Sequence, residues 1–195
     1  MVNSVKNDPL EQELYNTSSF RSLAEGRIFV AYWFGKWYSR FYERGGFMNI
    51  LSIGNSFSQD AQRYLHRIAR ADKVELNTFN LYIGGCPLSL HYQNILSEER
   101  RYTLEMNGSS TGFYVSLKEA LLNRDWDIVT IQQVSAQSPY YDTYQPYLDK
   151  LAEYIRLFVP KAKIVVHQTW AYEQGSRRLH EELKYSDYKQ MLCDI

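Results

Sequence analysis

The chain has 195 residues, 45% hydrophobic and 23% charged, and its 22 basic side chains balance 22 acidic ones. A chain of this length and composition can form one domain with a sizeable core, and zero net charge excludes a general attraction to nucleic acid or to an anionic membrane. The two cysteines, Cys86 and Cys193, are far apart and outside any C-x-x-C spacing, which excludes a disulfide framework and a zinc site. No stretch approaches the roughly 18 apolar residues of a transmembrane helix.

Residues 1–47 form an extension that differs from the rest of the chain. Its apolar run, 28–34, is short and is followed by basic residues, so it lacks the longer apolar centre and the cleavage site of a signal peptide. We therefore expect a cytoplasmic protein. The extension has three interpretations: a helix packed on the domain, an amphipathic helix on a membrane surface, or translated upstream sequence ahead of a true start at residue 48. The domain itself is predicted over 48–195.

Within this domain, strand patterns alternate with helical periodicity. The strand patterns cover 49–54, 74–83, 127–133 and 163–167, and helical patterns cover 59–71, 115–123, 144–158 and 175–193. Residues 88–105 carry a further helix and the start of a small hairpin, with Asn107-Gly108-Ser109 as its turn. Strands that alternate with helices predict βαβ crossovers, and continuous apolar runs predict a parallel sheet that helices cover on both faces.

Polar or small residues follow each of the four predicted strands. The strands end in Gly54-Asn55-Ser56, in Gly84-Gly85-Cys86, in Gln132-Gln133-Val134-Ser135 and in His167-Gln168-Thr169-Trp170. Because ligands of open α/β sheets bind beyond the carboxyl ends of the strands, these residues are candidates for one site at one edge of the sheet.

Ser56 at the first strand end has two interpretations. A serine just before a helix is commonly its N-cap. The same position also places a hydroxyl beside backbone N–H groups that can hold an oxyanion. Gly54 allows the tight turn that exposes this serine.

The other strand ends supply candidate partners for Ser56. Gly85 could bring its backbone N–H close to a substrate carbonyl, or could simply form a turn. Gln132 and Gln133 end a buried strand and must find partners, either as donors to an oxyanion or as structural bonds to a loop. His167 is either a substrate contact or a satisfied core histidine.

In this order the residues resemble the SGNH, or GDSL-type, esterase and lipase superfamily. Ile53-Gly54-Asn55-Ser56-Phe57-Ser58 is similar to its first block, with Asn55 where Asp is usual, and Ile83-Gly84-Gly85-Cys86-Pro87-Leu88 is similar to its second. The third block usually supplies an Asn, and Gln132-Gln133 stands in its place, as in the carbohydrate acetylesterase branch. The segments WDIVTIQQ and VVHQTWAY look like those of a largely uncharacterised bacterial branch of the superfamily.

The resemblance implies a three-layer α/β/α, flavodoxin-like fold with strand order 2-1-3-4. It implies Ser56 as the nucleophile and Gly85 with Gln132 and Gln133 in the oxyanion hole. Asn55, His167 and Trp170 are the expected substrate-binding residues. The expected substrate is a small-molecule or carbohydrate ester, with no metal, no other cofactor and no nucleic acid.

One block of the superfamily is missing. Its histidine and aspartate come late, as Asp-x-x-His after a fifth strand, and this sequence contains no Asp-x-x-His. We therefore expect a domain that lacks its last strand and its general base, with weak or no activity and an exposed fourth strand open to self-association. Of the histidines, His91 follows the second block, near the edge of the site. His167 lies on the correct edge but two strands from Ser56, roughly 10 Å away.

Three functions fit these residues. The first is a serine ester hydrolase of SGNH type, close to a carbohydrate O-acetylesterase. The second is a non-catalytic module that binds a small molecule or carbohydrate on the same fold. The third is a flavodoxin-like binder of a phosphate ligand at the Ser56 helix, and it ranks last because the chain has no Gly-rich phosphate loop.

Overall fold

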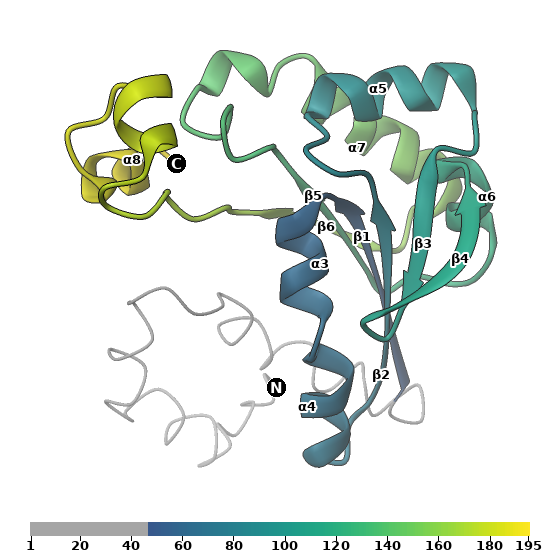
Figure 1. Cartoon of the computed structure of the whole chain (residues 1–195). Coiled ribbons are helices and arrows are strands. Elements are labelled where there is room, and N and C mark those ends of the chain that lie inside the picture. The colour runs from purple at the N-terminus through teal and green to yellow at the C-terminus, as the bar shows by residue number, and fades with distance from the viewer. Residues whose placement is uncertain (1–46) are drawn as a thin grey trace, which may run out of the picture. The chain divides into compact units, whose positions relative to one another are not determined.

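In the computed structural model, which describes residues 47–195, a six-stranded sheet has the order β4-β3-β2-β1-β5-β6 (Figure 1). The interpretations of the N-terminal extension concern residues that lie, apart from Phe47, outside this part. The strands are β1 Phe47–Gly54, β2 Glu75–Tyr82, β3 Tyr102–Met106, β4 Ser109–Val115, β5 Ile128–Gln132 and β6 Lys163–His167.

The four strands β2, β1, β5 and β6 are parallel neighbours in this order. The sequence-based order 2-1-3-4 is therefore confirmed. Among the described residues no strand pairs with the outer side of β6, where the side chain of Val166 is 49% exposed. Self-association through this edge stays a prediction.

The antiparallel strands β3 and β4 extend the sheet beyond β2. The predicted helix and start of a hairpin within 88–105 are confirmed, because the helix ends at Ser97 and β3 begins at Tyr102. Asn107 and Gly108 both have positive φ, 52° and 79°, which is typical of a two-residue hairpin turn and joins antiparallel strands. The sheet is thus mixed rather than purely parallel.

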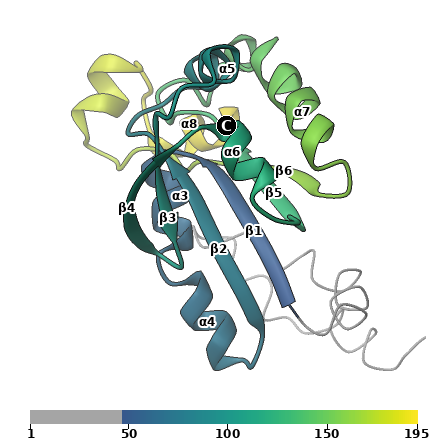
Figure 2. The same cartoon turned by 90° about the vertical axis from the view of Figure 1, so that its right-hand side faces the viewer.

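Helices cover both faces of the sheet (Figure 2). On one face lie α3 Ser56–Gln62 and α4 Leu65–Ala71, which replace the single helix predicted over 59–71. On the other lie α5 Leu88–Ser97, α6 Leu117–Leu122 and α7 Tyr147–Phe158. After β6 the chain forms a short helical turn, η4 Arg178–Glu182, and the helix α8 Tyr188–Asp194. The expected three-layer arrangement is confirmed.

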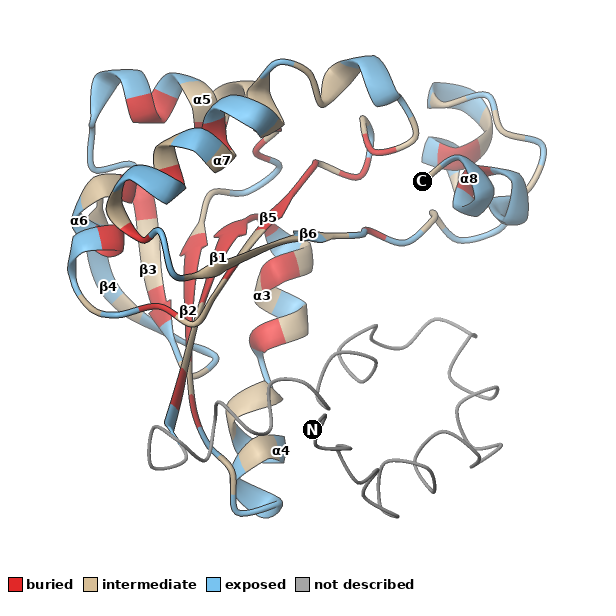
Figure 3. Ribbon diagram, turned by 180° about the vertical axis from the view of Figure 1, so that it is seen from behind, coloured by how far each residue is buried: buried red, intermediate tan, exposed pale blue. Residues whose placement is uncertain are grey.

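The two faces of the sheet carry different kinds of side chain, apolar on one face and partly polar on the other. Leu51, Ile53, Val129 and Ile131 belong to the apolar core together with side chains of α5, α6 and α7. Because side chains alternate along a strand, the residues between them face α3. There Ser52 accepts hydrogen bonds from Gln62 of α3 and from Thr130 of β5. Figure 3 shows buried residues concentrated in the strands and in the sides of helices that face them.

Candidate active site

The turn from β1 into α3 exposes Ser56. Asn55, and not Ser56, is the N-cap of α3, because its Oδ1 accepts a 3.2 Å hydrogen bond from the Phe57 N–H. The N-cap interpretation of Ser56 is therefore wrong. Ser56 is the first helical residue and is exposed, and its hydroxyl makes no hydrogen bond to any described residue.

Ser56 lines a cavity of about 580 Å³ at the carboxyl edge of the sheet. The strand ends meet there, since Ser56 follows β1, Gly85 follows β2 and Ser135 follows β5. Tyr172 and Arg178, from the segment after β6, also line the cavity. As the sequence predicts, residues from several strand ends converge on one edge.

Two residues that line this cavity have a backbone N–H without a partner in the described chain. The N–H groups of Ser56 and Gly85 donate to no described residue. Gly85 has a φ of +61°, and a Cβ built on it would have nothing within 4 Å. The glycine is therefore required by its left-handed backbone rather than by crowding.

Gln132 lies beneath the turn rather than in the cavity. It is 1% exposed, and its Nε2 donates a 2.6 Å hydrogen bond to Asn55 Oδ1. Its Oε1 is buried and accepts no hydrogen bond from the described residues. Gly54 makes this packing possible, because a Cβ there would lie 2.7 Å from both Gln132 Oε1 and Ser58 Oγ.

Gln133 points elsewhere and supports two loops. Its Oε1 accepts hydrogen bonds from the N–H groups of Leu88, at 3.1 Å, and Val134, at 2.8 Å. Its Nε2 donates to the carbonyl oxygen and the hydroxyl of Thr143. Its amide is occupied on both sides, so the structure assigns it the structural bonds that were the alternative to an oxyanion role.

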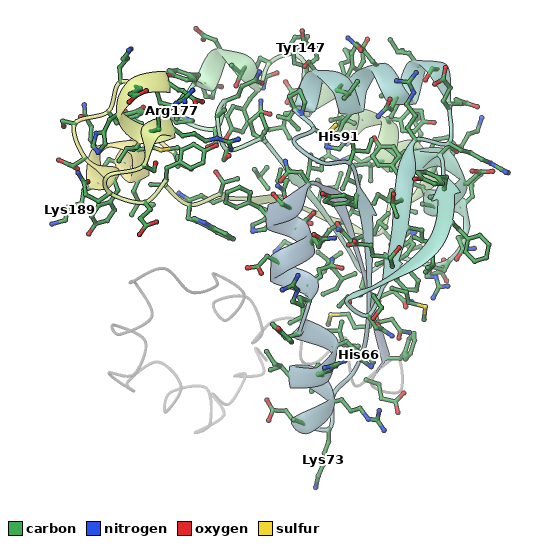
Figure 4. All side chains as sticks on the ribbon, viewed as in Figure 1. His66, Lys73, His91, Tyr147, Arg177 and Lys189 are labelled. Atoms are coloured by element: carbon green, nitrogen blue, oxygen red, sulfur yellow. The ribbon has the colours of Figure 1, made fainter. Side chains whose placement is uncertain are left out.

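No histidine lines the Ser56 cavity. His167 is half-buried at the end of β6, where burial lowers its pKa. His66 contacts the carbonyl oxygen of Leu76 at 2.6 Å, and His180 accepts a 3.1 Å hydrogen bond from Gly175 N–H. Figure 4 shows His66 on α4 and His91 on α5, on separate parts of the fold. These four are all the histidines of the chain.

His91 lies in a buried cluster behind the Gly85 loop instead of at the site edge. Its Nδ1 is 3.0 Å from the Tyr102 hydroxyl and 3.5 Å from Cys86 Sγ. Burial lowers the pKa of His91 to about 3 and raises the pKa of Cys86 to about 12. The imidazole and the thiol are therefore both neutral at pH 7, and Cys86 is a packed residue rather than a nucleophile.

The segment after β6 brings further residues to Ser56. Trp170, predicted as a substrate-binding residue, packs on Phe57 with ring centroids 4.2 Å apart. A smaller cavity of about 300 Å³ is lined by Trp170, Phe57 and Ser56 among others. In contrast, His167 and Gln133 line neither cavity.

Sequence reasoning missed Tyr172, Arg178 and Glu182 as cavity residues. The Tyr172 hydroxyl is 2.6 Å from Ser135 Oγ and accepts a 3.4 Å hydrogen bond from Arg178 Nη1. The only signal in the sequence was their position shortly after a strand end.

No group of His, Cys, Asp and Glu within residues 47–195 is arranged to hold a metal ion. Nor does this part contain a helix long and apolar enough to cross a membrane.

Together these features define a mixed α/β protein with an exposed serine at a cavity on the carboxyl edge of its sheet, where two backbone donors have no partner within residues 47–195. Residues 49–194 match the DUF4886 family, described as a domain of unknown function. The chain belongs to this family.

Two solved structures are similar to the chain. A DUF4886 family protein from Bacteroides uniformis ATCC 8492 has 32% sequence identity and a TM-score of 0.71, over 76% of this chain and 60% of that one. The chain thus spans three fifths of that relative's length. A "putative SGNH hydrolase" from Slackia heliotrinireducens has 22% identity and a TM-score of 0.49, over 76% and 69% of the two chains. No curated protein matches.

Proposed function

We propose that this chain carries the nucleophile and the oxyanion donors of an SGNH-type serine ester hydrolase that acts on an acylated carbohydrate. The observation that carries the proposal is the position of Ser56. Its exposed hydroxyl shares a cavity with Gly85, and the N–H groups of both residues are without a partner in the described chain. The carbohydrate as substrate comes from the resemblance of the Gln132-Gln133 block to the acetylesterase branch.

In the proposed reaction, Ser56 Oγ forms a bond to the ester carbonyl carbon and loses its proton to a general base. The N–H groups of Ser56 and Gly85 donate to the oxyanion of the tetrahedral intermediate. The bond from carbon to the leaving oxygen then breaks, and this oxygen takes the proton from the base and is released as a hydroxyl. Water removes the acyl group from Ser56 in a second round of the same steps.

Gln132 has a positioning role in this proposal. Its amide nitrogen donates one hydrogen to Asn55 Oδ1, and Gln132 lines neither cavity. By holding Asn55 it fixes the cap of α3 and thereby the direction of the Ser56 side chain. Asn55 Nδ2 also donates a 3.3 Å hydrogen bond to the Cys86 carbonyl oxygen, which links the turn to the Gly85 loop.

The histidine general base of the superfamily is the missing part. No histidine lines the Ser56 cavity, and the sequence has no Asp-x-x-His. Since a serine hydroxyl without a base is a weak nucleophile, we expect the chain as given to hydrolyse esters slowly. The same observation favours a second candidate function, a module that binds a carbohydrate without reacting with it.

Chemical rescue separates these two functions. Imidazole added to the solution can act as the base in a cavity of about 580 Å³. We expect imidazole to raise the rate of 4-nitrophenyl acetate hydrolysis by the unchanged chain above the rate with Ser56→Ala. Ser97→Ala, a change at an exposed serine of α5, should behave like the unchanged chain. Equal rates for the unchanged chain and Ser56→Ala at every imidazole concentration would contradict the hydrolase and favour the binding module.

A further inference from the structure

Ser56 lies where two cavities meet. The cavity of about 580 Å³ contains Gly85, and the cavity of about 300 Å³ contains Trp170, while Ser56 and Phe57 line both. The chain that carries Trp170 leaves the end of β6 and passes the start of α3 (Figure 1). An ester whose carbonyl reaches Ser56 therefore has room on the Trp170 side as well as on the Gly85 side.

The Trp170 side offers an aromatic surface that the protein leaves open. Trp170 is 45% exposed, although its ring centroid is 4.2 Å from that of Phe57 at an interplanar angle of 52°. The contact with Phe57 holds the indole without covering it. An exposed aromatic ring in a cavity beside polar groups is a typical ligand contact.

The charges of the two cavities select against a charged ligand. Each cavity is lined by one arginine and one carboxylate: Arg63 with Asp60 beside Trp170, and Arg178 with Glu182 beside Gly85. With one charge of each sign, neither cavity has a net charge that would favour an anion or a cation. They do provide hydrogen-bond donors and acceptors to a neutral polar ligand.

A sugar ring has the matching surface. Its C–H face is apolar and can lie against an indole, while the hydroxyls on its edge need donors and acceptors. A long acyl chain would instead require a mostly apolar cavity, whereas Gln59, Asp60 and Arg63 make up half of the smaller lining.

We propose that Trp170, held by Phe57, is the stacking platform for a ring of a neutral saccharide, and that the ester group of this saccharide enters the cavity of Ser56 and Gly85. The saccharide hydroxyl is thus the group that leaves when Ser56 attacks the ester. This inference rests on the proposed function for the reaction at Ser56, but the binding of the saccharide can be measured without any reaction.

The test measures binding of saccharides that carry no ester. The probes are neutral tetrasaccharides of glucose, xylose, mannose and N-acetylglucosamine, and the tetramer of galacturonic acid is the charged comparison. Binding is followed by saturation-transfer NMR and by calorimetry. We expect binding of at least one neutral tetrasaccharide, a loss of about ten-fold in affinity with Trp170→Ala, and near-normal affinity with Trp170→Phe, which keeps an aromatic face.

A matched control is Phe113→Ala. Phe113 is 69% exposed on β4 and lines neither cavity, so its removal should leave saccharide binding unchanged. Binding of none of the neutral tetrasaccharides would overturn the inference. So would equal losses with Trp170→Ala and Phe113→Ala, or a preference for the galacturonic acid tetramer.

The result also separates this inference from the proposed function. Binding that depends on Trp170, in a chain that shows no hydrolysis dependent on Ser56 with imidazole, would support the platform and contradict the hydrolase. Hydrolysis that depends on Ser56, in a chain that binds no neutral saccharide, would support the hydrolase and overturn the platform.

Discussion

The side-chain amide of Gln132 donates a 2.6 Å hydrogen bond to Asn55 Oδ1 across 77 residues of sequence. This bond ties the end of β5 to the cap of α3, directly beside Ser56. Asn55 Oδ1 also accepts from the Phe57 N–H, so a single oxygen atom joins the end of β5 to the start of α3.

Gln132→Glu and Gln132→Leu should have different effects on stability. Glutamate replaces the donor to Asn55 Oδ1 with a buried carboxylate oxygen, so we expect a loss of about 3 kcal/mol in the free energy of unfolding at pH 7. Leucine loses the same hydrogen bond but also removes the buried, unpartnered Oε1, so we expect a loss of about 1 kcal/mol. Urea denaturation of both variants measures the difference, and equal losses would contradict this account.

Asn55→Asp tests why this chain differs from the superfamily pattern at that position. Aspartate can still cap α3, but it cannot donate to the Cys86 carbonyl oxygen as Asn55 Nδ2 does at 3.3 Å. Asn55 is 1% exposed, so burial of a charge adds to the cost. We expect a loss of about 1–3 kcal/mol. A higher melting temperature for Asn55→Asp would show that the favourable field at the helix start outweighs these costs.

Gly54→Ala and Gly84→Ala form a matched pair. A Cβ at Gly54 would lie 2.7 Å from Gln132 Cδ and from Ser58 Oγ, whereas at Gly84 the nearest atom is the Tyr82 hydroxyl oxygen at 3.2 Å. The Tyr82 side chain can move, whereas Gln132 cannot move without losing its hydrogen bond to Asn55. We expect Gly54→Ala to lower the free energy of unfolding by about 1–3 kcal/mol and Gly84→Ala by about 0.5 kcal/mol or less. The reverse order in thermal unfolding would contradict the packing described.

The two cysteines should react at very different rates. Cys86 is fully buried and its pKa is raised to about 12, while Cys193 is exposed. Because the thiolate is the reactive form, we expect Ellman's reagent to label one thiol per native chain and both in denaturant. Cys193→Ser should abolish the native labelling. Native labelling that persists in Cys193→Ser would show that the Cys86 cluster opens to solvent.

His91 should make the domain sensitive to acid. Its pKa in the folded chain is about 3, while in the unfolded chain it returns to about 6.5. Between these values the unfolded chain binds a proton that the folded chain does not, so stability falls as the pH falls from about 6.5 to 3. The slope is about 1.4 kcal/mol per pH unit for one such group. Urea denaturation across this range should show a smaller slope for His91→Gln, and an unchanged slope would contradict the assignment.

The sequence predicted the meeting of Ser56 and Gly85 because the carboxyl ends of neighbouring parallel strands must share an edge. It could not separate Gln132 from Gln133. Consecutive strand residues point to opposite faces, so Gln132 reaches Asn55 while Gln133 reaches Leu88 on the other side. The register between β1 and β5 decides which of the two glutamines lies on the side of Ser56. This register is a tertiary property.

Other features were hidden for different reasons. Asn107-Gly108 indicated that the chain turns back as a hairpin, but not that the hairpin strands would extend the sheet beyond β2. Tyr172 and Arg178 reach the cavity from an irregular segment, where no periodicity indicates which side chains point inward. The N-cap interpretation of Ser56 required a helix that begins at Phe57. The helix begins at Ser56 instead, so Asn55 is the cap.

Covalent labelling tests the role of Ser56 most directly. The unchanged chain is incubated with a fluorophosphonate, with and without imidazole, and the modified residue is identified by peptide mapping. The account predicts a single adduct on Ser56 that forms faster with imidazole and is absent in Ser56→Ala. An adduct on another residue, or no adduct on Ser56 at any imidazole concentration, would contradict Ser56 as the nucleophile.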